Sequence, residues 1–571
     1  MEWSSPARAR QIPIVIRTKF YVMTMLIRYT DYYTWTRDAA LTMKVLVDEF
    51  VAGQTSFEQH IKDYIIAQAA LQGVSNPSGS LSDGSGLGEP KFEVNETAFT
   101  GPWGRPQRDG PALRATAIIA YAKHLLSTDQ TSVVTDLVWP VIRNDLSYVG
   151  QYWNQTGFDL WEEVQGSSFF TLTVSYRALV EGSALASQIG QSCPACDSQH
   201  AQVLCFMQSF WNGQYIDSNI NVDEGRSGKD VNSVLASIHN FDPSATCDDN
   251  TFQPCSSRAL ANHKQLTDSF RIFPINSGIA TGQAVAVGRY PEDVFMGGNP
   301  WYLATFAAAE QLYDALAQWN TIGSITVDSN NRAFFQALVP STTTGTYTSG
   351  TSVFASLTAA VKTYADGYMT IAQKYTPSDG SLSEQFNNAT GIPLSAVDLT
   401  WSYAAFLTAN ARRNNRLPAT WLTSGSNNLP PQCNPSSALG TYSSVSATSF
   451  PTGTSTASAT ATSTVCPTAL AMTFNEHATT SYGEGIFITG SIAELGSWST
   501  DSSARIALSA DKYADSDPLW YTKITLPTGT NIQYKYYRVG SDGQITWESD
   551  PNRSYAVPSC QASDAVNDTW R

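Results

Sequence analysis

The stretch FFTLTVSYRALVEGSALASQI, residues 169–189, does most to narrow the choice of fold. Its apolar residues recur at steps of three and four, so they fall on one face of an α-helix. Loops rich in Gly, Ser, Asn and Pro, such as Asn76–Pro90 and Ser341–Thr351, separate further stretches of this kind. The pattern predicts an all-α domain of stacked helical hairpins with one face built from loops. The other predicted helices are Ala39–Phe50, Pro111–Leu126, Ser132–Trp153, Tyr302–Trp319, Phe354–Tyr375 and Leu394–Arg413.

The segment Asn434–Val465 has a different composition. It holds no charged residue, and Ser or Thr fill 17 of its 32 positions. Such a stretch cannot bury a core and is typical of a linker that carries O-linked glycans. An unmodified flexible spacer is the alternative interpretation, and both place a domain boundary here.

Short runs of β-branched and aromatic residues follow the linker, separated by Pro, Gly, Asp and Ser. They predict a small β-sandwich over the last part of the chain. Cys466 and Cys560 bracket this part, so a disulfide that joins its ends is plausible. The predicted strands are Gly485–Ser491, Leu519–Leu526, Ile532–Val539 and Gln544–Glu548.

The composition excludes several classes of function. Of the 571 residues, 42% are hydrophobic, which excludes disorder for the chain as a whole. Only 15% are charged, below the ~25% of an average soluble protein, and the net charge is −15. A phosphate backbone or an anionic membrane surface attracts basic proteins, so neither nucleic acid nor membrane is an expected partner.

Cysteine usage points to an oxidising compartment. The chain has eight cysteines, an even number, which suggests disulfides and secretion. Cys193-Pro-Ala-Cys196 could be a redox pair or half of a zinc site, but the six histidines form no ligand-spaced cluster, so a structural bridge is favoured. Acceptor triplets for N-linked glycans fit secretion as well, at Asn95, Asn154, Asn388, Asn552 and Asn567.

The first residues do not look like a signal peptide. Basic residues are scattered through 1–30, and the apolar run Phe20–Ile27 is too short to span a bilayer and too far from the start for a signal. We therefore interpret residues 1–27 as an atypical or misassigned N-terminus.

Candidate chemistry lies where carboxylates are embedded among aromatic residues. Glu162 and Glu163 follow Trp161, Glu384 lies in the loop SLSEQ, and Arg37 precedes Asp38 in TWTRD. Aromatic faces stack on sugars, Arg and Asp hold hydroxyls, and a carboxylate pair supplies general acid and base. The alternative is that such neighbours merely sit at helix ends.

These strings give the chain a family resemblance. TWTRD (34–38), GRPQRDGPALRA (104–115), YWNQTGFDLWEEVQGSSFF (152–170), AVAVGRYPED (284–293), GNPW (298–301), SLSEQ (381–385) and DLTWSYAA (398–405) resemble the fungal glucoamylases of glycoside hydrolase family 15. YGEGIFITGSIAELGSW (482–498) and WESDPNR (547–553) resemble the starch-binding module of carbohydrate-binding module family 20.

The resemblance implies an architecture and an activity. We expect an (α/α)6 barrel at 28–433, a Ser/Thr-rich linker at 434–465 and an all-β starch-binding sandwich at 466–571. The implied activity is inverting exo-hydrolysis of α-1,4, and more slowly α-1,6, glucosidic bonds from non-reducing ends, which releases β-D-glucose. The implied substrates are starch, amylose, amylopectin and maltooligosaccharides, and a secreted monomer without cofactor or metal is expected.

The resemblance also implies residue roles. By its place in WEEV, Glu162 corresponds to the general acid, and by its place in SLSEQ, Glu384 corresponds to the general base. An inverting pair needs room for water, with carboxyls roughly 6.5–9.5 Å apart. The implied substrate-binding residues are Trp35, Arg37, Asp38, Trp103, Trp161, Glu163, Arg289, Tyr290, Asp293, Trp301 and Trp401, and Asp159 is placed to tune the acid.

For the sandwich, Trp498, Lys535, Trp547 and Asn552 correspond to one starch-binding site, and Tyr482, Tyr513 and Trp520 to a second. Some of these aromatics could instead belong to the sandwich core. The implied disulfides are Cys193–Cys196, Cys205–Cys433, Cys247–Cys255 and Cys466–Cys560.

Before TWTRD the match stops. We therefore expect the first barrel helix of the family to be missing, and the chain as written to fold poorly, because a domain has only about 5–15 kcal/mol of stability to spare. Two other functions stay open: an inverting hydrolase of a different α-glucoside, and a starch-binding protein whose barrel is inactive.

Overall fold

The protein divides into two compact units, with the boundary after residue 452. The structure is a computed structural model, and it describes residues 33–222, 225–445, 450, 469–481, 483–501, 505–510, 513–514, 517–540, 543–558 and 563–571. The expected atypical N-terminus at 1–27 lies outside these residues, as does the question of a missing first helix. No helix in the described residues is both long and apolar enough to span a bilayer.

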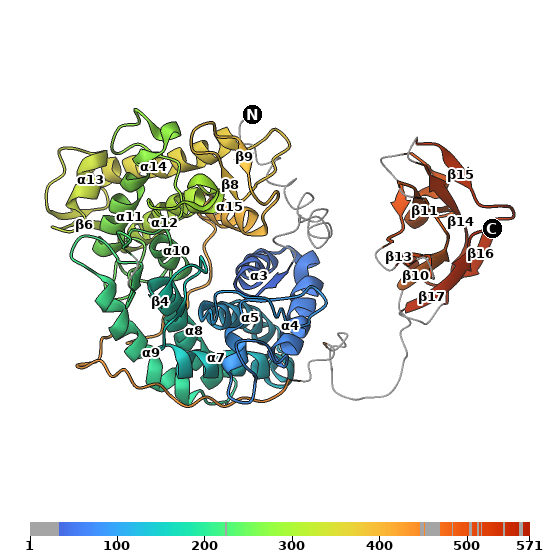
Figure 1. Ribbon diagram of the computed structural model, residues 1–571, viewed down its shortest axis with the longest axis horizontal. Coiled ribbons are helices and arrows are strands. Elements are labelled where there is room, and N and C mark those ends of the chain that lie inside the picture. Colours follow the sequence, from blue (N-terminus) through green and yellow to red (C-terminus); the bar gives the residue numbers. More distant parts are fainter. Residues whose placement is uncertain are drawn as a thin grey trace. The chain divides into compact units, whose positions relative to one another are not determined.

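Six helices of the described residues form a closed ring in the first unit (Figure 1). Each packs on the next, and the last packs back on the first. A helix that is apolar nearly all round needs cover on every side, and the buried faces of the ring helices are correspondingly wide. In ring order the six are α3 (Thr36–Val51), α5 (Asp109–Ser127), α8 (Phe169–Gln188), α10 (Asn232–His239), α12 (Tyr302–Ile322) and α15 (Thr400–Arg413).

A second layer of helices covers the ring. α4 and α7 lie against α3 and α5, α9 lies against α8, α11 against α10 and α14 against α12. This arrangement confirms the expected all-α fold with inner and outer helices. The sequence pattern missed α4, α9, α10, α11 and the short α13. The outer helices are α4 (Glu58–Gln72), α7 (Trp139–Tyr152), α9 (Pro194–Met207), α11 (Ser257–Ser269), α13 (Arg332–Leu338) and α14 (Ser352–Tyr375).

Three sequence predictions need correction, one at its boundary and two in the interior of the predicted segment. The helix expected at Leu394–Arg413 begins only at Thr400, because strand β9 (Pro393–Leu394) pairs with β8 (Gln385–Phe386) in a hairpin. The helix expected at 132–153 is broken by a π-helical turn, Val134–Val138. The loop expected at 341–351 contains β7 (Gly345–Thr348), which pairs with β6 (Ser324–Val327).

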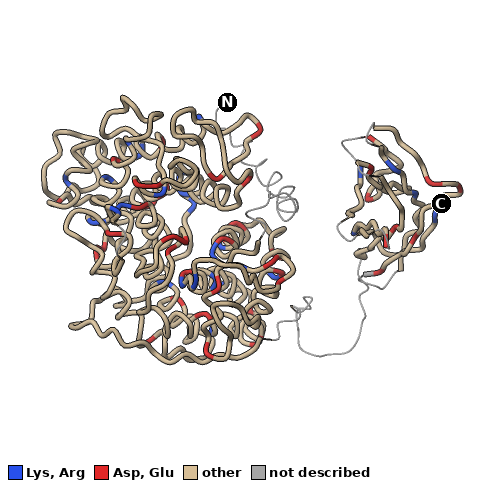
Figure 2. Tube along the Cα trace, viewed as in Figure 1, with Lys and Arg blue, Asp and Glu red and all other residues tan. Residues whose placement is uncertain are grey.

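Charged residues are sparse along the trace, and most of the tube in Figure 2 is tan. Several of those present form buried pairs in the C-terminal halves of the ring helices. Glu181 of α8 accepts from Arg177 and from Lys123 of α5, at 2.8 and 2.6 Å. On α15, Arg412 lies 3.4 Å from Asp314 of α12. Pairing outweighs burial at Glu181, where Lys123 and Arg177 lower the pKa to about 2, whereas burial prevails over Arg412 at Asp314 and raises the pKa of that carboxyl.

The second unit is a β-sandwich, as the sequence predicts. One sheet pairs β10 (Ala469–His477) antiparallel with β13 (Leu519–Pro527) and parallel with β17 (Ser563–Thr569). Alternate residues of β10, namely Leu470, Met472 and Phe474, face the core. The pattern missed β10, β12, β16 and β17. The other sheet holds β12 (Ile506–Ala507), β11 (Gly485–Gly490), β14 (Asn531–Val539), β15 (Ile545–Trp547) and β16 (Arg553–Ala556).

Three of the four implied disulfides are present: Cys193–Cys196, Cys205–Cys433 and Cys247–Cys255. Cys466 and Cys560 lie outside the described residues.

The described start of the predicted linker, residues 434–445, lies along α7. Asn144 donates to the Ser443 carbonyl at 2.9 Å and accepts from its amide at 3.1 Å. The Gln151 carboxamide accepts from the Gly440 amide at 2.7 Å and from the Tyr442 hydroxyl at 3.1 Å. This segment is therefore bound to the helical unit.

We expect Tyr442→Ala to destabilise the helical unit. The variant loses the packing of the Tyr442 ring over Gly84 and its hydrogen bond to Gln151, together worth on the order of 1–2 kcal/mol. Calorimetry of the full chain measures the change. Leu439→Ala is the matched control, because Leu439 is 89% exposed in the same segment. Equal melting temperatures for Tyr442→Ala and the control would contradict the bound segment.

Candidate active site

The predicted site residues gather where the ring helices begin. Arg37 and Asp38 lie in the first turn of α3, and Trp401 in that of α15. Glu162 and Glu163 precede α8, and Trp301 immediately precedes α12. Because the ring helices run the same way, six helix N-termini, the positive ends of the helix dipoles, meet at this end. The fold thus collects segments that are far apart in the sequence.

Glu162 lies in a tight turn between β3 (Gly157–Phe158) and β4 (Gln165–Ser168). The buried carboxylate of Asp159 accepts from the amides of Glu163 and Val164, at 3.0 and 3.1 Å, which fixes the turn. Glu162 itself has φ +67°, a left-handed conformation that is unusual for a side chain of this kind. The surrounding contacts must hold this conformation, since it costs of order 1–3 kcal/mol.

Two side chains donate hydrogen bonds to the Glu162 carboxyl. Arg37 donates from Nη2 to Oε1 at 3.2 Å, and Trp103 donates from Nε1 to Oε2 at 2.8 Å. Burial nevertheless dominates and raises the pKa of Glu162 to about 7, with Arg37 opposing the shift and nearby Asp38 adding to it. Glu162 is therefore a carboxyl that holds its proton up to near-neutral pH, as a general acid must.

Arg37 is held in turn by two groups that the sequence did not single out. Its Nη1 donates to Gln107 Oε1 at 2.8 Å and to Asp109 Oδ2 at 3.0 Å. Asp109 opens α5, so this ion pair joins the first two ring helices at their N-termini. Both residues lie in the string GRPQRDGPALRA (104–115), and this was the signal that could have found them.

Glu163 faces two cations and a hydroxyl. Arg289 Nη1 lies 2.9 Å from its Oε1, Arg226 Nη2 lies 3.0 Å from its Oε2, and the Tyr290 hydroxyl donates to Oε2. Asp293 fixes Arg289 through two hydrogen bonds of 2.8 and 2.7 Å. These contacts hold the Glu163 carboxylate in place through charge-assisted hydrogen bonds.

Glu384 lies at the edge of the β8–β9 hairpin. Its Oε2 accepts from Gln385 Nε2 at 2.8 Å and from the Ser395 hydroxyl. Its amide donates to the Ala396 carbonyl at 2.8 Å, and its carbonyl accepts from the amide of Tyr302, the first residue of α12, at 3.3 Å. The corrected start of α15 thus has a function here, because residues 393–399 hold Glu384. Ser395 gave no sequence signal.

Aromatic rings line this end of the ring. The Trp161 ring stacks 6.1 Å from Trp401 and lies 5.5 Å from Trp301, and all three are at most 7% exposed. Trp103 is 43% exposed and packs edge-on against Trp35, at 5.8 Å. The exposed ring of Trp103 offers a face on which a sugar can stack, and the three buried rings form the wall of this end.

Two further residues at this end escaped the sequence analysis. The buried ammonium of Lys91 lies 3.3 Å from the centre of the Trp103 ring. This cation–π contact stabilises the position of the Trp103 ring. Asp230 accepts from the Trp161 indole. Among the described residues, no group of three or more His, Cys, Asp or Glu is arranged to hold a metal ion.

The predicted starch-binding residues of the sandwich lie in several places. Trp498 and Trp547 are 37% and 42% exposed, as platforms for a sugar must be. Lys535 of β14 pairs with Asp550, close in sequence to Asn552. Trp520 is 8% exposed and donates its indole N–H to the Ala478 carbonyl, so it packs in the core under the edge of Tyr513. Tyr482 lies outside the described residues.

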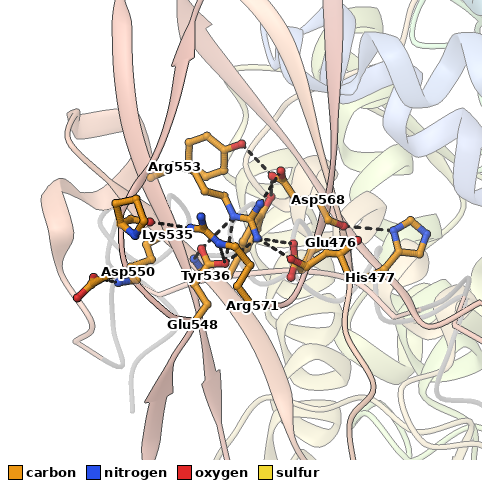
Figure 3. Close-up of polar contacts among 12 residues, drawn as sticks. Glu476, His477, Lys535, Tyr536, Glu548, Asp550, Arg553, Asp568 and Arg571 are labelled. Carbon is orange, nitrogen blue, oxygen red and sulfur yellow. Dashed lines mark hydrogen bonds and ion pairs between the residues drawn. The ribbon is translucent and has the colours of Figure 1, made fainter.

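A buried ion network holds the segment that carries Trp547 and Asn552 (Figure 3). Arg553 lies 2.6 Å from Glu548 and 2.8 Å from Asp568 of β17, and so joins this segment to the other sheet. Glu476 of β10 is fully buried, 3.7 Å from Arg553, and neither of its oxygens has a hydrogen-bond partner in the described residues. Burial raises the pKa of Glu476 to about 8.

We expect Glu476 to make the sandwich less stable as pH rises. Its pKa is higher in the folded state than in the unfolded state, so the folded state binds the proton more tightly and stability falls between about pH 4.5 and 8. Glu476→Gln removes this proton and should flatten the dependence of the sandwich's melting temperature on pH. Calorimetry of the full chain from pH 5 to 8 measures both slopes; equal slopes would contradict a buried neutral carboxyl.

Known proteins share both units of this chain. Residues 20–411 match the model of the glycosyl hydrolases family 15, and residues 469–566 match that of the starch binding domain. The chain is 56% identical to a glucoamylase of Neurospora crassa over 551 residues, which cover 95% of this chain and 87% of the relative. It is 53% identical to glucoamylase-1 of Arthroderma benhamiae, covering 95% and 88%.

The structure also resembles a solved family 15 glucoamylase from Hypocrea jecorina, with TM-score 0.73 and 55% identity over 95% of this chain and 92% of that one. The chain therefore belongs to the glycosyl hydrolases of family 15 and carries a starch-binding domain in its second unit.

Proposed function

We propose that this protein is a glucoamylase, which hydrolyses α-1,4 and more slowly α-1,6 glucosidic bonds from the non-reducing ends of starch, amylose, amylopectin and maltooligosaccharides. The single observation that carries the proposal is the environment of Glu162, a largely buried carboxyl with a raised pKa between Arg37 and Trp103. The names of the similar proteins support the same activity.

In this proposal Glu162 gives its proton to the glycosidic oxygen as the bond breaks. Arg37 donates to Glu162 at 3.2 Å and so stabilises the carboxylate that remains. Trp103 also donates to this carboxylate, which spreads the new charge over two donors. Because Asp109 holds the Arg37 guanidinium through Nη1, this cation does not have to move during the reaction.

Glu384 removes a proton from the attacking water in this proposal. Gln385 and Ser395 fix one of its oxygens and so set the orientation of the carboxylate that accepts the proton. Attack from the face opposite the leaving group inverts the anomeric carbon, so an α-linked glucose leaves as β-D-glucose. Glu163, held by Arg289 and Arg226, would accept from hydroxyls of the terminal sugar.

The remaining features fit a secreted enzyme that works on insoluble starch. Three disulfides indicate an oxidising compartment, so we propose secretion. The starch-binding domain would hold the enzyme at the substrate surface and raise the local concentration of chain ends. A monomer is sufficient for this scheme, since each described site residue comes from one chain.

The products of maltoheptaose hydrolysis test the reaction. Proton NMR of fresh products should show β-glucose as the only early product, and Glu384→Gln should abolish its release because the base is lost. Glu494→Gln, an exposed carboxylate in the other unit, is the matched control and should keep full activity. Early α-glucose or internal cleavage would contradict inverting exo-action, and starch binding without glucose release would indicate an inactive barrel.

The pH dependence of kcat tests Glu162 separately. Since Glu162 acts as an acid, kcat should fall as pH rises through about 7. The Trp103 hydrogen bond favours the ionised form, so Trp103→Phe should raise the pKa of Glu162 and move this limb to higher pH.

Trp153→Phe is the control for this shift. It also removes an indole N–H that is hydrogen-bonded, to Gln199 at 2.9 Å, but between α7 and α9. Its alkaline limb should stay where it is in the wild type. A limb that Trp103→Phe leaves in place or moves to lower pH would mean that Trp103 does not stabilise the Glu162 carboxylate.

A further inference from the structure

A buried carboxylate that the proposed reaction does not use lies next to the turn of residues 159–164 that carries Glu162 (the acid turn). Asp230 is 3% exposed and immediately precedes Val231 and the start of α10. Both of its oxygens lie within hydrogen-bond distance of the Trp161 indole nitrogen, at 2.9 and 3.0 Å. Trp161 is the residue directly before Glu162.

Asp230 is itself fixed to the ring. Its Oδ1 accepts from the Asn232 amide at 2.8 Å, and its carbonyl accepts from the Ser233 hydroxyl at 2.7 Å. The next amide, of Val231, donates to the Arg289 carbonyl at 2.8 Å. A carboxylate held this way moves only if the start of α10 or the Arg289 segment moves with it.

Trp161 connects Asp230 to the acid turn, because its indole bonds to Asp230 and its backbone leads directly into Glu162. Its ring lies between Trp301 and Trp401, and the Arg289 guanidinium lies 5.4 Å from its centre. Stacking sets the plane of an indole ring but does not choose between its two orientations about the Cβ–Cγ bond, which put the N–H at opposite edges; a hydrogen bond to the N–H does. The strained φ of Glu162, one residue on, requires neighbours held in this way.

We propose that Asp230 is a positioning residue for the acid turn: by holding the Trp161 indole it fixes Glu162 and Glu163 against the substrate. The proposal rests on the proposed function, which makes Glu162 the acid. Asp230 does not touch the substrate in this scheme and acts only through Trp161.

The charge state of Asp230 suits this role. Burial, together with the nearby carboxyl of Asp159, raises the pKa of Asp230 to about 8, against the hydrogen bonds from Asn232 and Trp161 and the charge of Arg289. At the pH where Glu162 carries its proton, Asp230 is therefore neutral and adds no negative charge beside the acid turn. An Asn at this position has the same shape, no charge and the same Oδ1 acceptor.

Four variants of the full chain separate positioning from helix capping. Asp230→Asn keeps the Oδ1 acceptor for both Trp161 and Asn232. Asp230→Ser keeps an acceptor for the Asn232 amide, as an N-cap does, but is one bond too short to reach the indole. Trp161→Phe removes the indole N–H, and the double variant Asp230→Ser/Trp161→Phe closes a mutant cycle.

We expect Asp230→Ser to lower kcat on maltoheptaose by about 10- to 100-fold with little change in KM, because a misplaced acid slows the chemical step. Asp230→Asn should stay within about threefold of the wild type, since the hydrogen bonds that Oδ1 accepts from Trp161 and Asn232 survive. In the Trp161→Phe background, Asp230→Ser should change kcat by less than about twofold. Asp242→Ala is the control: this buried carboxylate holds Trp421, away from the site, so melting temperature should fall and kcat stay.

The indole N–H resonance of Trp161, assigned by its absence in Trp161→Phe, reports the contact without turnover. It should be protected from exchange in the wild type and in Asp230→Asn, and unprotected in Asp230→Ser. A protected resonance in a wild type that releases no glucose would mean that the proposed function, and not the contact, is wrong.

Three results would overturn the positioning role. The first is an equal loss of kcat for Asp230→Ser with and without Trp161→Phe. The second is a loss in Asp230→Asn as large as that in Asp230→Ser. The third is an indole N–H that exchanges equally fast in every variant.

Discussion

The closure of the helical ring, where α15 packs back on α3, is the constraint on which the rest of the first unit depends. A closed ring of six parallel helices has one end where all of them begin. Any residue just before or within a first turn lies at that end, however distant it is in sequence. Arg37 lies at this end for that reason, as does Glu162 in the turn before α8. Glu384 is fixed to the same end because its carbonyl accepts from the amide of Tyr302, the first residue of α12. The ion pair of Arg37 with Asp109 joins α3 to α5 there, and so holds the ring as well as the site.

Burial and pairing give two adjacent glutamates opposite tasks. Glu162 is largely buried with one cation at 3.2 Å, and burial prevails, so its pKa rises to about 7. Glu163 has two arginines within 3.0 Å, and in the proposed reaction it accepts from hydroxyls of the sugar. The difference comes from the strained turn, which directs the two side chains to different partners. The acid therefore depends on backbone geometry as much as on its immediate neighbours.

The sequence predicted the helices that are long and strongly periodic, such as α5, α8 and α12, because a 3.6-residue period sustained over many residues is typical of an α-helix and not of a strand or a loop. Length was not sufficient, because α4, α9 and α11 have 15, 14 and 13 residues and were also missed. The pattern missed α10, which has only eight residues, and it extended α15 backward over residues that form a hairpin around Glu384. In both places tertiary contacts decide the structure, and no local pattern carries them.

The residues of the candidate site were also predicted only in part. Residues inside recognisable strings, such as Glu162, Arg289 and Trp301, were predicted, although their roles as substrate contacts stay predictions. Ser395 and Asp230, which hold such residues, were not predicted, and Gln107 received no role although it lies in the string GRPQRDGPALRA, because a hydrogen bond between side chains that are apart in the sequence leaves no trace in one sequence. Likewise, the composition of 434–445 indicated a spacer, yet its backbone is bound to α7.

Burial makes Glu162 an acid that is protonated near neutral pH, although Arg37 and Trp103 both favour its ionised form. A direct titration of the carboxyl carbon of Glu162 by ¹³C NMR, in the full chain labelled at glutamate and assigned with Glu162→Gln, tests it. The account predicts a midpoint near 7. A midpoint near the ordinary value of about 4.3 for a glutamate would contradict it.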